Sequence, residues 1–396
     1  MFGGIIIAIC FVPAILTVVW FAEVAAGCLA LGKKPLASSA SQKRPVHRTT
    51  VLIPAHDEGE GVVPTIRDVQ AQLGPNDHIL LVADNCTDDT ASIAEAAGVE
   101  VIVRVDQARR GKGYALEFGI RHLALNPPDV VIVLDADCRI GQYAIPMLSS
   151  YAMACGGPVQ SLYLMLAPKD APVGKGLNLF AWRIKNWIRP LGLNLVGLPT
   201  QLFGTGMAFP TGLLLNRDMG NNRLAEDAAL GIALATAGHP ARFLSEARVH
   251  SSLPVSQVGH EQQRERWEKG HLENIVDLVP RALIKSLRDG NIGLATLALD
   301  MAVPPLSLLV LVTVVCGVFA AIAAALGAPL VVLAAPFASG MLLVLGTTIA
   351  WIAVGRDVLP LRELLRLPLH AIRKFSFYYR IASGKGTSTW IRTDRK

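Results

Sequence analysis

The feature that most constrains this chain is an apolar zone: residues 301–355 contain no charged side chain. Such a zone holds two helices of the roughly 20 residues that are needed to cross the hydrocarbon core of a membrane. A glycine and a proline at 326–329 interrupt it near its middle and predict a tight turn between the two helices. A buried helix pair in a soluble protein is the alternative, which the length of the uncharged zone disfavours.

A third apolar segment lies at the N-terminus. Residues 2–22 carry no charge, and the first basic residues, Lys33 and Lys34, follow the segment, whereas a cleaved signal peptide begins with them. Basic flanks favour the cytoplasmic side, so we expect the N-terminus to face outward and the chain after it to face inward. The prediction is a multi-pass protein of the plasma (inner) membrane whose central part is cytoplasmic.

The composition agrees with this organisation. Apolar residues make up 52% of the chain, and charged residues only 17%. The net charge of +6 fits basic residues at a membrane face and a groove for an anionic substrate, so it requires no nucleic acid. The six cysteines show no metal-ligand spacing, and we expect them to be reduced thiols.

Residues 48–291 lie between the apolar segments and are numerous enough to form their own core. Runs rich in Val, Ile and Leu alternate there with helical patterns, which indicates a mostly parallel sheet covered by helices on both faces. The expected strands are 49–55, 78–84, 99–105 and 130–137, and the expected helices are 62–73, 88–98 and 113–125. Sites in such sheets collect at the carboxyl ends of the strands, and no dinucleotide or P-loop glycine motif is present.

Two acids follow the last of these strands. Asp135 and Asp137 would point to opposite faces of a regular strand, but where the chain bends both can turn toward one cation. Their hard oxygen ligands suit Mg²⁺ or Mn²⁺. An acidic turn without a ligand is one alternative. Another is the aspartyl nucleophile of a phosphatase, which stands on the first strand of its domain, whereas at least three strands come before this one.

Three further segments carry candidate chemistry. Lys112 lies in a basic, glycine-rich loop that either approaches a phosphate or forms a solvated turn. Glycines in the segment 203–210 allow another molecule close to the backbone. Glu226 and Asp227 begin an expected helix, where acids either complement the helix dipole or supply a general base.

The segment "QRERW" falls within an expected helix. Gln263, Arg266 and Trp267 are spaced at i, i+3 and i+4, so they share one helix face. A guanidinium beside an indole is suited to hold a diphosphate and a sugar ring.

In their order along the chain, these motifs resemble the membrane-embedded inverting transferases of glycosyltransferase family 2, which include cellulose, hyaluronan and poly-N-acetylglucosamine synthases. The matching segments are "IPAHDE", "ADNCTDDT", "RRGKGYAL", "LDADC", "FGTGMAF", "AED" and "QRERW". The resemblance implies an α/β GT-A domain with a Rossmann-like, mostly parallel sheet. It also implies a nucleotide-diphosphate sugar as donor, expected to be a UDP-sugar, and Mg²⁺ or Mn²⁺ as cofactor.

The resemblance also implies residue roles. Asp227 is the expected catalytic base, with Glu226 beside it. The implied donor and nucleotide contacts are Pro54, Ala55, Asp57, Glu58, Asp84, Lys112, Asp135, Gln263, Arg266 and Trp267. The implied acceptor contacts are Gly204, Thr205, Gly206 and Trp267. The implied metal ligands are Asp135, Asp137 and His250, and Trp390 and Thr393 resemble a C-terminal segment near the active site of the family.

The chain departs from the family pattern in two places. Ala225 stands where the family has a threonine, which removes a hydroxyl but leaves the acids. Only three spans are expected, which puts an export channel within one chain in doubt and makes an export partner or a homo-oligomer an expectation. The expected parts are an N-terminal span in 1–31, a GT-A domain in 48–291, two spans in 301–355, and an interfacial helix (367–380) with a tail in 358–396.

The predicted function is transfer of a sugar from a nucleotide-diphosphate sugar to a growing polysaccharide at the membrane. Transfer of one sugar to a lipid acceptor is the alternative, because ceramide glucosyltransferases share the Q-x-x-R-W set. A catalytically silent membrane scaffold and a phosphatase using Asp135 are the competing hypotheses from other classes.

Overall fold

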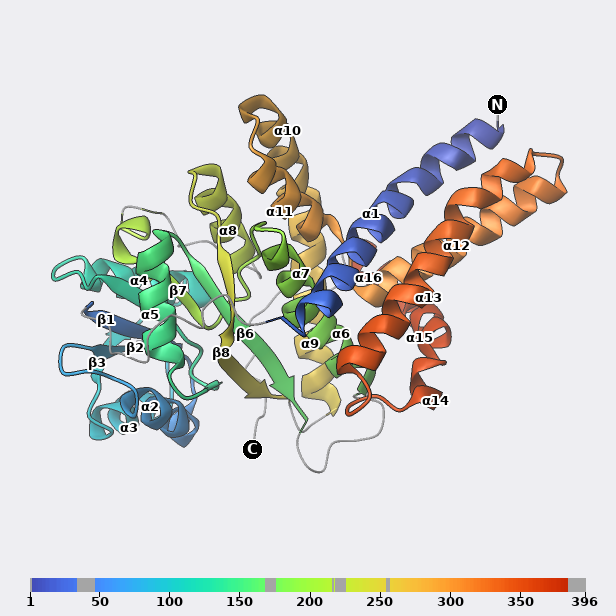
Figure 1. Ribbon diagram of the computed structural model, residues 1–396. Helices are drawn as coiled ribbons and strands as arrows, with labels where there is room; N and C mark the ends of the chain where they lie inside the picture. The colour runs from blue at the N-terminus through green and yellow to red at the C-terminus, as the bar shows by residue number, and fades with distance from the viewer. Residues whose placement is uncertain are drawn as a thin grey trace.

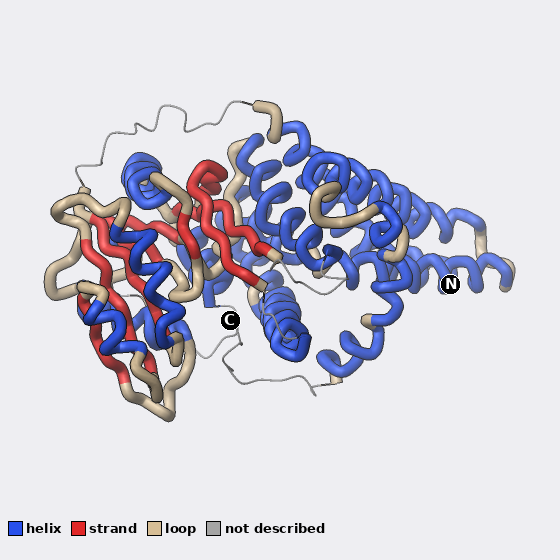
Figure 2. The backbone as a smooth tube through the Cα atoms, turned by 90° about the horizontal axis from the view of Figure 1, so that it is seen from below, coloured by secondary structure: helices blue, strands red, loops and turns tan. Residues whose placement is uncertain are grey.

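The computed structural model describes residues 2–33, 47–167, 176–215, 217, 226–253 and 257–383. These residues form an α/β part built on an eight-stranded sheet, and an arm of long helices that extends from one side of it (Figure 1). Seen from below, the strands gather at one end of the molecule and the arm is entirely helical (Figure 2).

The first four neighbouring strands of the sheet are parallel, as the sequence predicts. They lie in the order β3-β2-β1-β4, and each is paired in parallel with its neighbour. Their bounds are Thr49–Ala55 (β1), His78–Asp84 (β2), Glu100–Arg104 (β3) and Val130–Val133 (β4). The connecting helices are Val62–Gln70 (α2), Thr90–Ala96 (α3) and Lys112–Leu123 (α4), with a 3₁₀ turn at Gly59–Gly61 (η1).

The second half of the sheet reverses direction. Strand β7 is antiparallel to both β4 and β6, β8 is parallel to β6, and the two-residue β5 is antiparallel to β8, so the whole sheet is mixed. These strands span Arg139–Ile140 (β5), Val159–Leu166 (β6), Met207–Pro210 (β7) and Arg242–Ser252 (β8). Helix α5 (Ala144–Cys155) lies between β5 and β6, and a 3₁₀ turn, η3 (Thr211–Leu213), follows β7.

Apolar residues bury both faces of the sheet. Val51 and Ile53 of β1 pack in one core cluster with Ile66 of α2, whereas Leu52 packs in another with Leu116 of α4. This alternation follows from the period of two along a strand. It confirms the prediction that helices cover both faces.

Helices link the sheet to the arm. Helix α6 (Gly176–Arg183) continues through a π-helical turn, η2 (Ile184–Ile188), into α7 (Arg189–Leu195). The later helices are Glu226–Thr236 (α8), Gln257–Asp277 (α9), Val279–Asp289 (α10) and Ile292–Ala302 (α11).

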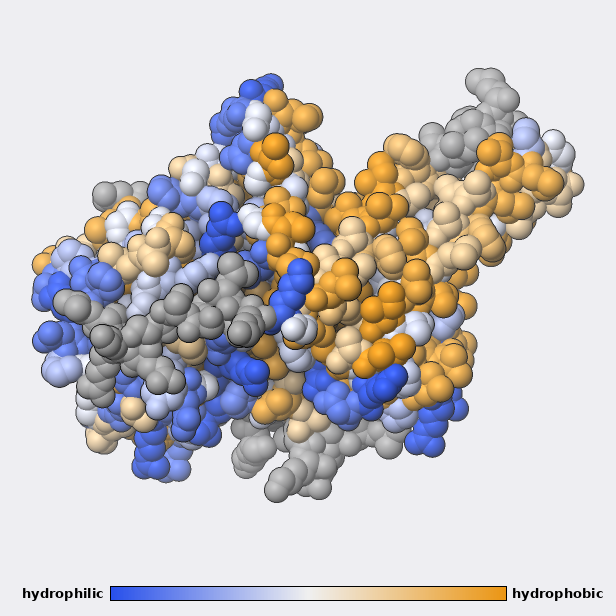
Figure 3. All heavy atoms as spheres, viewed as in Figure 1, coloured by the Kyte–Doolittle hydropathy of each residue, from blue (hydrophilic) through white to orange (hydrophobic). Residues whose placement is uncertain are grey.

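Three helices of the arm are long and apolar enough to cross a membrane, as predicted from the sequence. They are α1 (Phe2–Ala30), α12 (Leu306–Ala325) and α13 (Ala334–Val354), and the short η4 (Leu330–Leu333) precedes α13. The N-terminal end of α1 and the turn after α12 lie at the same far end of the arm (Figure 1). Apolar residues cover most of the visible surface of the arm (Figure 3).

An ion-paired cluster fastens α1 to the rest of the protein. Arg189 Nε donates to Glu23 Oε2 at 2.6 Å, and Arg189 Nη2 donates to Asp300 Oδ1 at 2.5 Å. All three side chains are buried. The backbones of α1 and α7 also touch closely, because a Cβ on Gly27 or on Gly192 would collide with the carbonyl oxygen of the facing helix.

The end of the described chain differs from the prediction. The single helix expected over 367–380 is divided into α15 (Leu367–Arg373) and α16 (Phe375–Ala382), after a short α14 (Leu361–Leu364). Lys374, at the break, is buried, and its Nζ donates to Glu268 Oε1 at 2.6 Å and to Ser307 Oγ at 3.1 Å. The helix is therefore interrupted only at Lys374, where the backbone N–H of Lys374 still donates to the carbonyl oxygen of His370 at 3.2 Å, and its interfacial position stays a prediction.

Candidate active site

The two acids after β4 lie on a sharp bend. Thr65 of α2 holds this bend, because its Oγ1 lies 2.7 Å from the carbonyl oxygens of both Ala136 and Cys138. One ligand atom each of Asp135, Asp137 and Cys138 lies within 4.8 Å of the others. The bend therefore turns both carboxylates toward a common point, as the sequence hypothesis requires.

The donor set fits a hard divalent ion. Burial raises the pKa of the Cys138 thiol, so the sulfur stays protonated and the two carboxylates are the suitable ligands. His250 lies in β8 opposite Arg139 of β5 and is not part of this cluster. Burial and then Arg139 lower its pKa, which keeps the imidazole neutral. Its role as a third ligand stays a prediction.

Lys112, the first residue of α4, connects the bend to the glycine-containing segment. Its Nζ donates to Asp135 Oδ1 and, at 2.7 Å, to the carbonyl oxygen of Gly204. The backbone N–H of Asp135 also donates to Thr205 Oγ1 at 3.0 Å. Lys112, which is predicted to bind phosphate, therefore contacts both Asp135, a predicted metal ligand, and the predicted acceptor segment.

Gln160 of β6 holds the segment 203–206 in place through hydrogen bonds. This residue was not identified from the sequence. Gln160 is fully buried; its Nε2 donates to the carbonyl oxygen of Thr205 at 2.9 Å, and its Oε1 accepts from the N–H of Phe203 at 2.8 Å. Gly204 and Gly206 have φ of +85° and +64°, which favour glycine. Two polar residues, Gln160 and Ser161, at the start of a strand that is otherwise mostly apolar are the signal that could have found Gln160.

Asp227 lies across a small gap from Lys112. A Cβ added to Gly204 would lie 3.4 Å from Asp227 Oδ2 and 3.6 Å from Lys112 Nζ. Burial raises the pKa of Asp227, although the nearby Lys112 opposes this. Burial also raises the pKa of Glu226 to about 7. A carboxylate with a raised pKa next to a cation is suited to accept a proton.

The predicted Q-x-x-R-W residues lie in α9 as expected. Burial lowers the pKa of Arg266, and the carboxylates of Glu226 and Asp135 oppose this effect. The ring of Trp267 lies 4.8 Å from that of Trp182. Gln263 is buried, and its Oε1 has no hydrogen-bond partner among the described residues.

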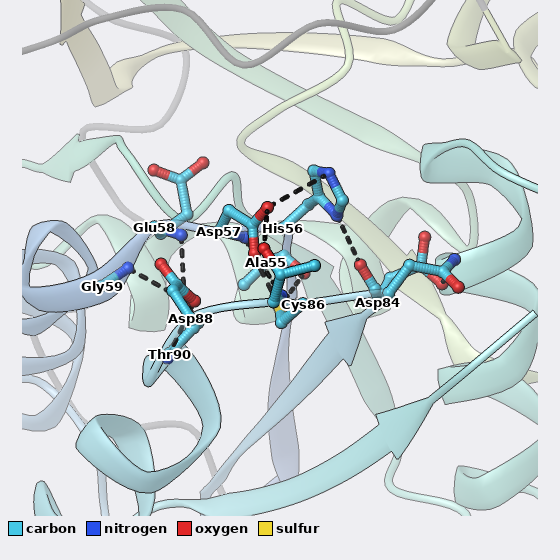
Figure 4. A network of polar contacts seen from close by, with 11 residues as sticks. Ala55, His56, Asp57, Glu58, Gly59, Asp84, Cys86, Asp88 and Thr90 are labelled. Atoms are coloured by element: carbon cyan, nitrogen blue, oxygen red, sulfur yellow. Dashed lines mark hydrogen bonds and ion pairs between the residues drawn. The ribbon is translucent and has the colours of Figure 1, made fainter. Parts of the chain in front are cut away.

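A second polar network joins the loops after β1 and β2 (Figure 4). Asp57 has a φ of +53°, and its carboxylate accepts from the N–H and Oγ1 of Thr87 at 2.6 and 3.1 Å. Burial raises the pKa of Asp57, but these hydrogen bonds outweigh it and hold that pKa below its usual range. The N–H groups of Glu58 and Gly59 both donate to Thr90 Oγ1. The network orders the segment that includes Pro54 and Ala55.

Asp84, the last residue of β2, is already paired with Arg104. Its buried Oδ1 accepts from Arg104 Nη1 at 2.6 Å and from Asn85 Nδ2 at 3.1 Å. Arg104, which also pairs with Asp106, is a second residue that the sequence analysis missed. Ala225, Trp390 and Thr393 lie outside the described residues.

With this geometry established, the chain can be compared with known proteins. The model of a family described as glycosyltransferase like family 2 matches residues 47–270, more than half of the chain. This protein belongs to glycosyltransferase family 2. A comparison with curated proteins finds no match.

Solved structures show the fold of this family 2 glycosyltransferase. It is similar to the mannosyltransferase PcManGT from Pyrobaculum calidifontis, solved with GDP-Man and Mn²⁺, at 17% identity and a TM-score of 0.55, over 94% of this chain and 99% of that one. Another match is glucosyl-3-phosphoglycerate synthase from Mycobacterium tuberculosis, solved with Mn²⁺, UDP and phosphoglyceric acid, at 22% identity and a TM-score of 0.35, over 59% of this chain and 80% of that one. The first match covers the arm as well as the sheet, and the predicted GT-A fold is confirmed.

Proposed function

We propose that this glycosyltransferase transfers a sugar from a nucleotide-diphosphate donor to an acceptor hydroxyl at the cytoplasmic face of a membrane, with inversion at the anomeric carbon. One observation carries the proposal: Lys112 contacts both Asp135 and the backbone of Gly204, and Asp227 lies across a small gap from it. A cation suited to phosphate, a carboxylate pair suited to a metal and a carboxylate suited to act as a base thus lie close together.

Mg²⁺ or Mn²⁺ would be held by Asp135 and Asp137, whose converging oxygens suit a hard ion. Such an ion, when bound, neutralises charge on the diphosphate of the donor. The structures of the two similar proteins, which were solved with Mn²⁺, support this choice of cofactor.

The chain's own residues supply the remaining chemistry. Asp227 accepts the proton of the acceptor hydroxyl while that oxygen bonds to the anomeric carbon, and the bond between this carbon and the diphosphate oxygen breaks. A positioned base commonly contributes about 10²–10⁴-fold to the rate. Arg266 and Lys112 stabilise the negative charge on the departing nucleoside diphosphate; Lys112 contacts Asp135, and the carboxylate of Asp135 also favours the charged form of Arg266.

Two points about substrates and location extend this proposal. UDP-sugars remain the expected donors from the sequence motifs, and the GDP-Man in the Pyrobaculum structure makes GDP-sugars the second donor class to test. The three apolar helices support a multi-pass protein of the plasma membrane, with the N-terminus outside and the active site in the cytoplasm.

The acceptor is either a lipid or a growing polysaccharide. A cavity lined by Trp267 and by residues of the candidate membrane spans favours a lipid-linked acceptor. The "QRERW" motif, which resembles that of the polymer synthases, favours a polysaccharide. An export partner or a homo-oligomer would then complete the path across the membrane.

The test is transfer from labelled UDP- and GDP-sugars by purified protein in membrane lipids, with Asp227→Asn as the key variant. We expect this variant to lose at least about 100-fold in turnover, because a positioned base contributes that much, while it still binds nucleoside diphosphate with Mn²⁺. Asp289→Asn, at an exposed carboxylate on α10, is the matched control and should retain wild-type turnover. Near-wild-type turnover of Asp227→Asn would refute the base assignment.

A further inference from the structure

A cavity of about 150 Å³ lies next to the candidate active site. Its lining includes Trp182 and Trp267, whose ring centroids lie 4.8 Å apart. It also includes Trp20 and Leu306, which belong to two of the candidate membrane spans. The cavity therefore connects the aromatic pair of the active site with the apolar helices of the arm.

Lys185 lines this cavity and has no hydrogen bond or ion pair with any residue that the structure describes. It lies on the π-helical turn η2, a geometry that occurs often at functional sites. Burial lowers its pKa, and the most strongly interacting carboxylate is that of Asp227. Lys185 is half-buried at the cavity wall, and an ammonium that is partly withdrawn from water without a partner among the described residues is costly, so this position calls for an anion from outside the chain.

The other charged groups of the cavity leave a positive excess. Arg264 Nε is buried without a hydrogen-bond partner in the described part of the chain. Glu268 accepts from Lys374 at 2.6 Å through Oε1, which lies 3.9 Å from Arg264, while its buried Oε2 has no partner among the described groups. Arg189 is already paired with two carboxylates. Among the described residues that line the cavity, Glu268 is therefore the one carboxylate against the cations Lys185, Arg264 and Lys374, while Asp227, outside the lining, also favours the charged form of Lys185.

We propose that this cavity binds the phosphate-bearing, hydroxylated head group of a lipid acceptor, with Lys185 and Arg264 on the phosphate and Glu268 Oε2 accepting from a head-group hydroxyl. The acyl chains then lie along the apolar helices of the arm, and another hydroxyl faces Asp227. This inference rests on the proposed function and adds the class of acceptor to it.

A neutral acceptor fits these groups less well. An uncharged sugar chain can stack on the tryptophans, but it leaves the half-buried ammonium of Lys185 without a bound counter-charge. A lipid phosphate supplies that charge and makes charge-assisted hydrogen bonds, which are about twice as strong as neutral ones. The positive charge of the cavity and the adjoining candidate membrane spans therefore both favour a lipid that carries a phosphate.

The experiment is a binding titration followed by tryptophan fluorescence, because three tryptophans line the cavity. Purified protein in polyoxyethylene micelles is titrated with phosphatidylinositol, with a neutral galactosyl diacylglycerol, and with inorganic phosphate. We expect phosphatidylinositol to bind at least tenfold more tightly than either of the others. Lys185→Gln and Arg264→Gln should each raise its Kd by about tenfold, because each removes a charge-assisted hydrogen bond, and should leave the Kd of the galactolipid unchanged.

Lys285→Gln is the matched control, since Lys285 is exposed on α10 and pairs only with Asp289 among the described residues. Equal affinity for the two lipids, or an unchanged Kd for phosphatidylinositol in both cavity variants, overturns the proposal. Inorganic phosphate that binds as tightly as the lipid overturns its lipid part. If Lys185→Gln fails to fold, Arg264→Gln decides the outcome.

A separate measurement on the same wild-type protein distinguishes the two proposals. Calorimetric binding of UDP or GDP in the presence of Mn²⁺ tests the donor site without any acceptor. Nucleotide binding without selectivity for the anionic lipid refutes only the acceptor inference. Selective lipid binding without any nucleotide binding refutes the proposed function.

Discussion

Replacing Arg189 by methionine should destabilise the protein strongly, because this guanidinium lies between two buried carboxylates. The guanidinium donates to the carboxylate of Glu23 at 2.6 Å and to that of Asp300 at 2.5 Å. It also donates to the backbone carbonyl oxygen of Asp300 at 2.7 Å. Gln201 donates to the second oxygen of Asp300 at 2.8 Å but carries no charge. The variant therefore leaves two buried acids without their counter-charge.

The magnitude follows from the burial of the cluster. Removing one partner of a buried ion pair costs about 3–5 kcal/mol. At roughly 2–4 °C per kcal/mol for a domain of 150–250 residues, the melting temperature should fall by roughly 6–20 °C. The close packing at Gly27 and Gly192 does not involve the arginine side chain, so the variant should still fold.

Thermal unfolding in detergent micelles measures the effect, with Arg121→Met as the matched control. Arg121 pairs with Glu117 on the surface of α4, and its side chain is 74% exposed, so its loss should change the stability by less than about 1 kcal/mol. Adding Glu23→Gln and Asp300→Asn to Arg189→Met should recover most of the lost stability, because no buried charge then remains unpaired. A melting temperature for Arg189→Met within about 2 °C of wild type, far below the shift expected from the pair, would contradict the reasoning.

Two further predictions concern the cleft. Gly204→Ala should lower turnover by about 100-fold, since its methyl group would lie 3.4 Å from Asp227 Oδ2 and would displace the acceptor hydroxyl by about 1 Å. Gly212→Ala is the control, because a methyl group there meets no atom within 4 Å. Equal turnover in the two variants would argue against an acceptor hydroxyl bound between Gly204 and Asp227. Transfer should decrease as the pH falls, because the base acts only when ionised, and burial raises the pKa of Asp227 above the value of about 4 that is usual for aspartate. A pH–rate profile of kcat/KM that stays flat down to pH 4 would exclude Asp227 as that base.

The sequence predicted the parts of the fold that depend on local patterns. The strands at 49–55 and 78–84 have the predicted bounds because their apolar runs end at polar turns. The three apolar helices follow from length and composition alone. Asp135 and Asp137 could be identified from the sequence, because two acids directly after a buried strand indicate a metal site.

The rest depends on contacts between distant parts of the chain. The pairing of Glu23 with Arg189 joins residues 166 positions apart, and no local pattern predicts it. Only the fold shows that Lys185 lines a cavity, where it has no hydrogen bond or ion pair with the residues that the structure describes. Similarly, the ion pair of Lys374 with Glu268 joins residues that lie 106 positions apart.

The most direct test of the account is to locate Mn²⁺ by anomalous scattering in crystals grown with the ion and the donor nucleotide sugar. We predict one Mn²⁺ at about 2.1 Å from a carboxylate oxygen of Asp137, with Asp135 beside it and the anomeric carbon facing Asp227. A second group of possible metal ligands, Asp57, Cys86 and Asp88, has ligand atoms within 4.8 Å of one another. An ion bound there instead, or a sugar directed away from Asp227, would contradict the account.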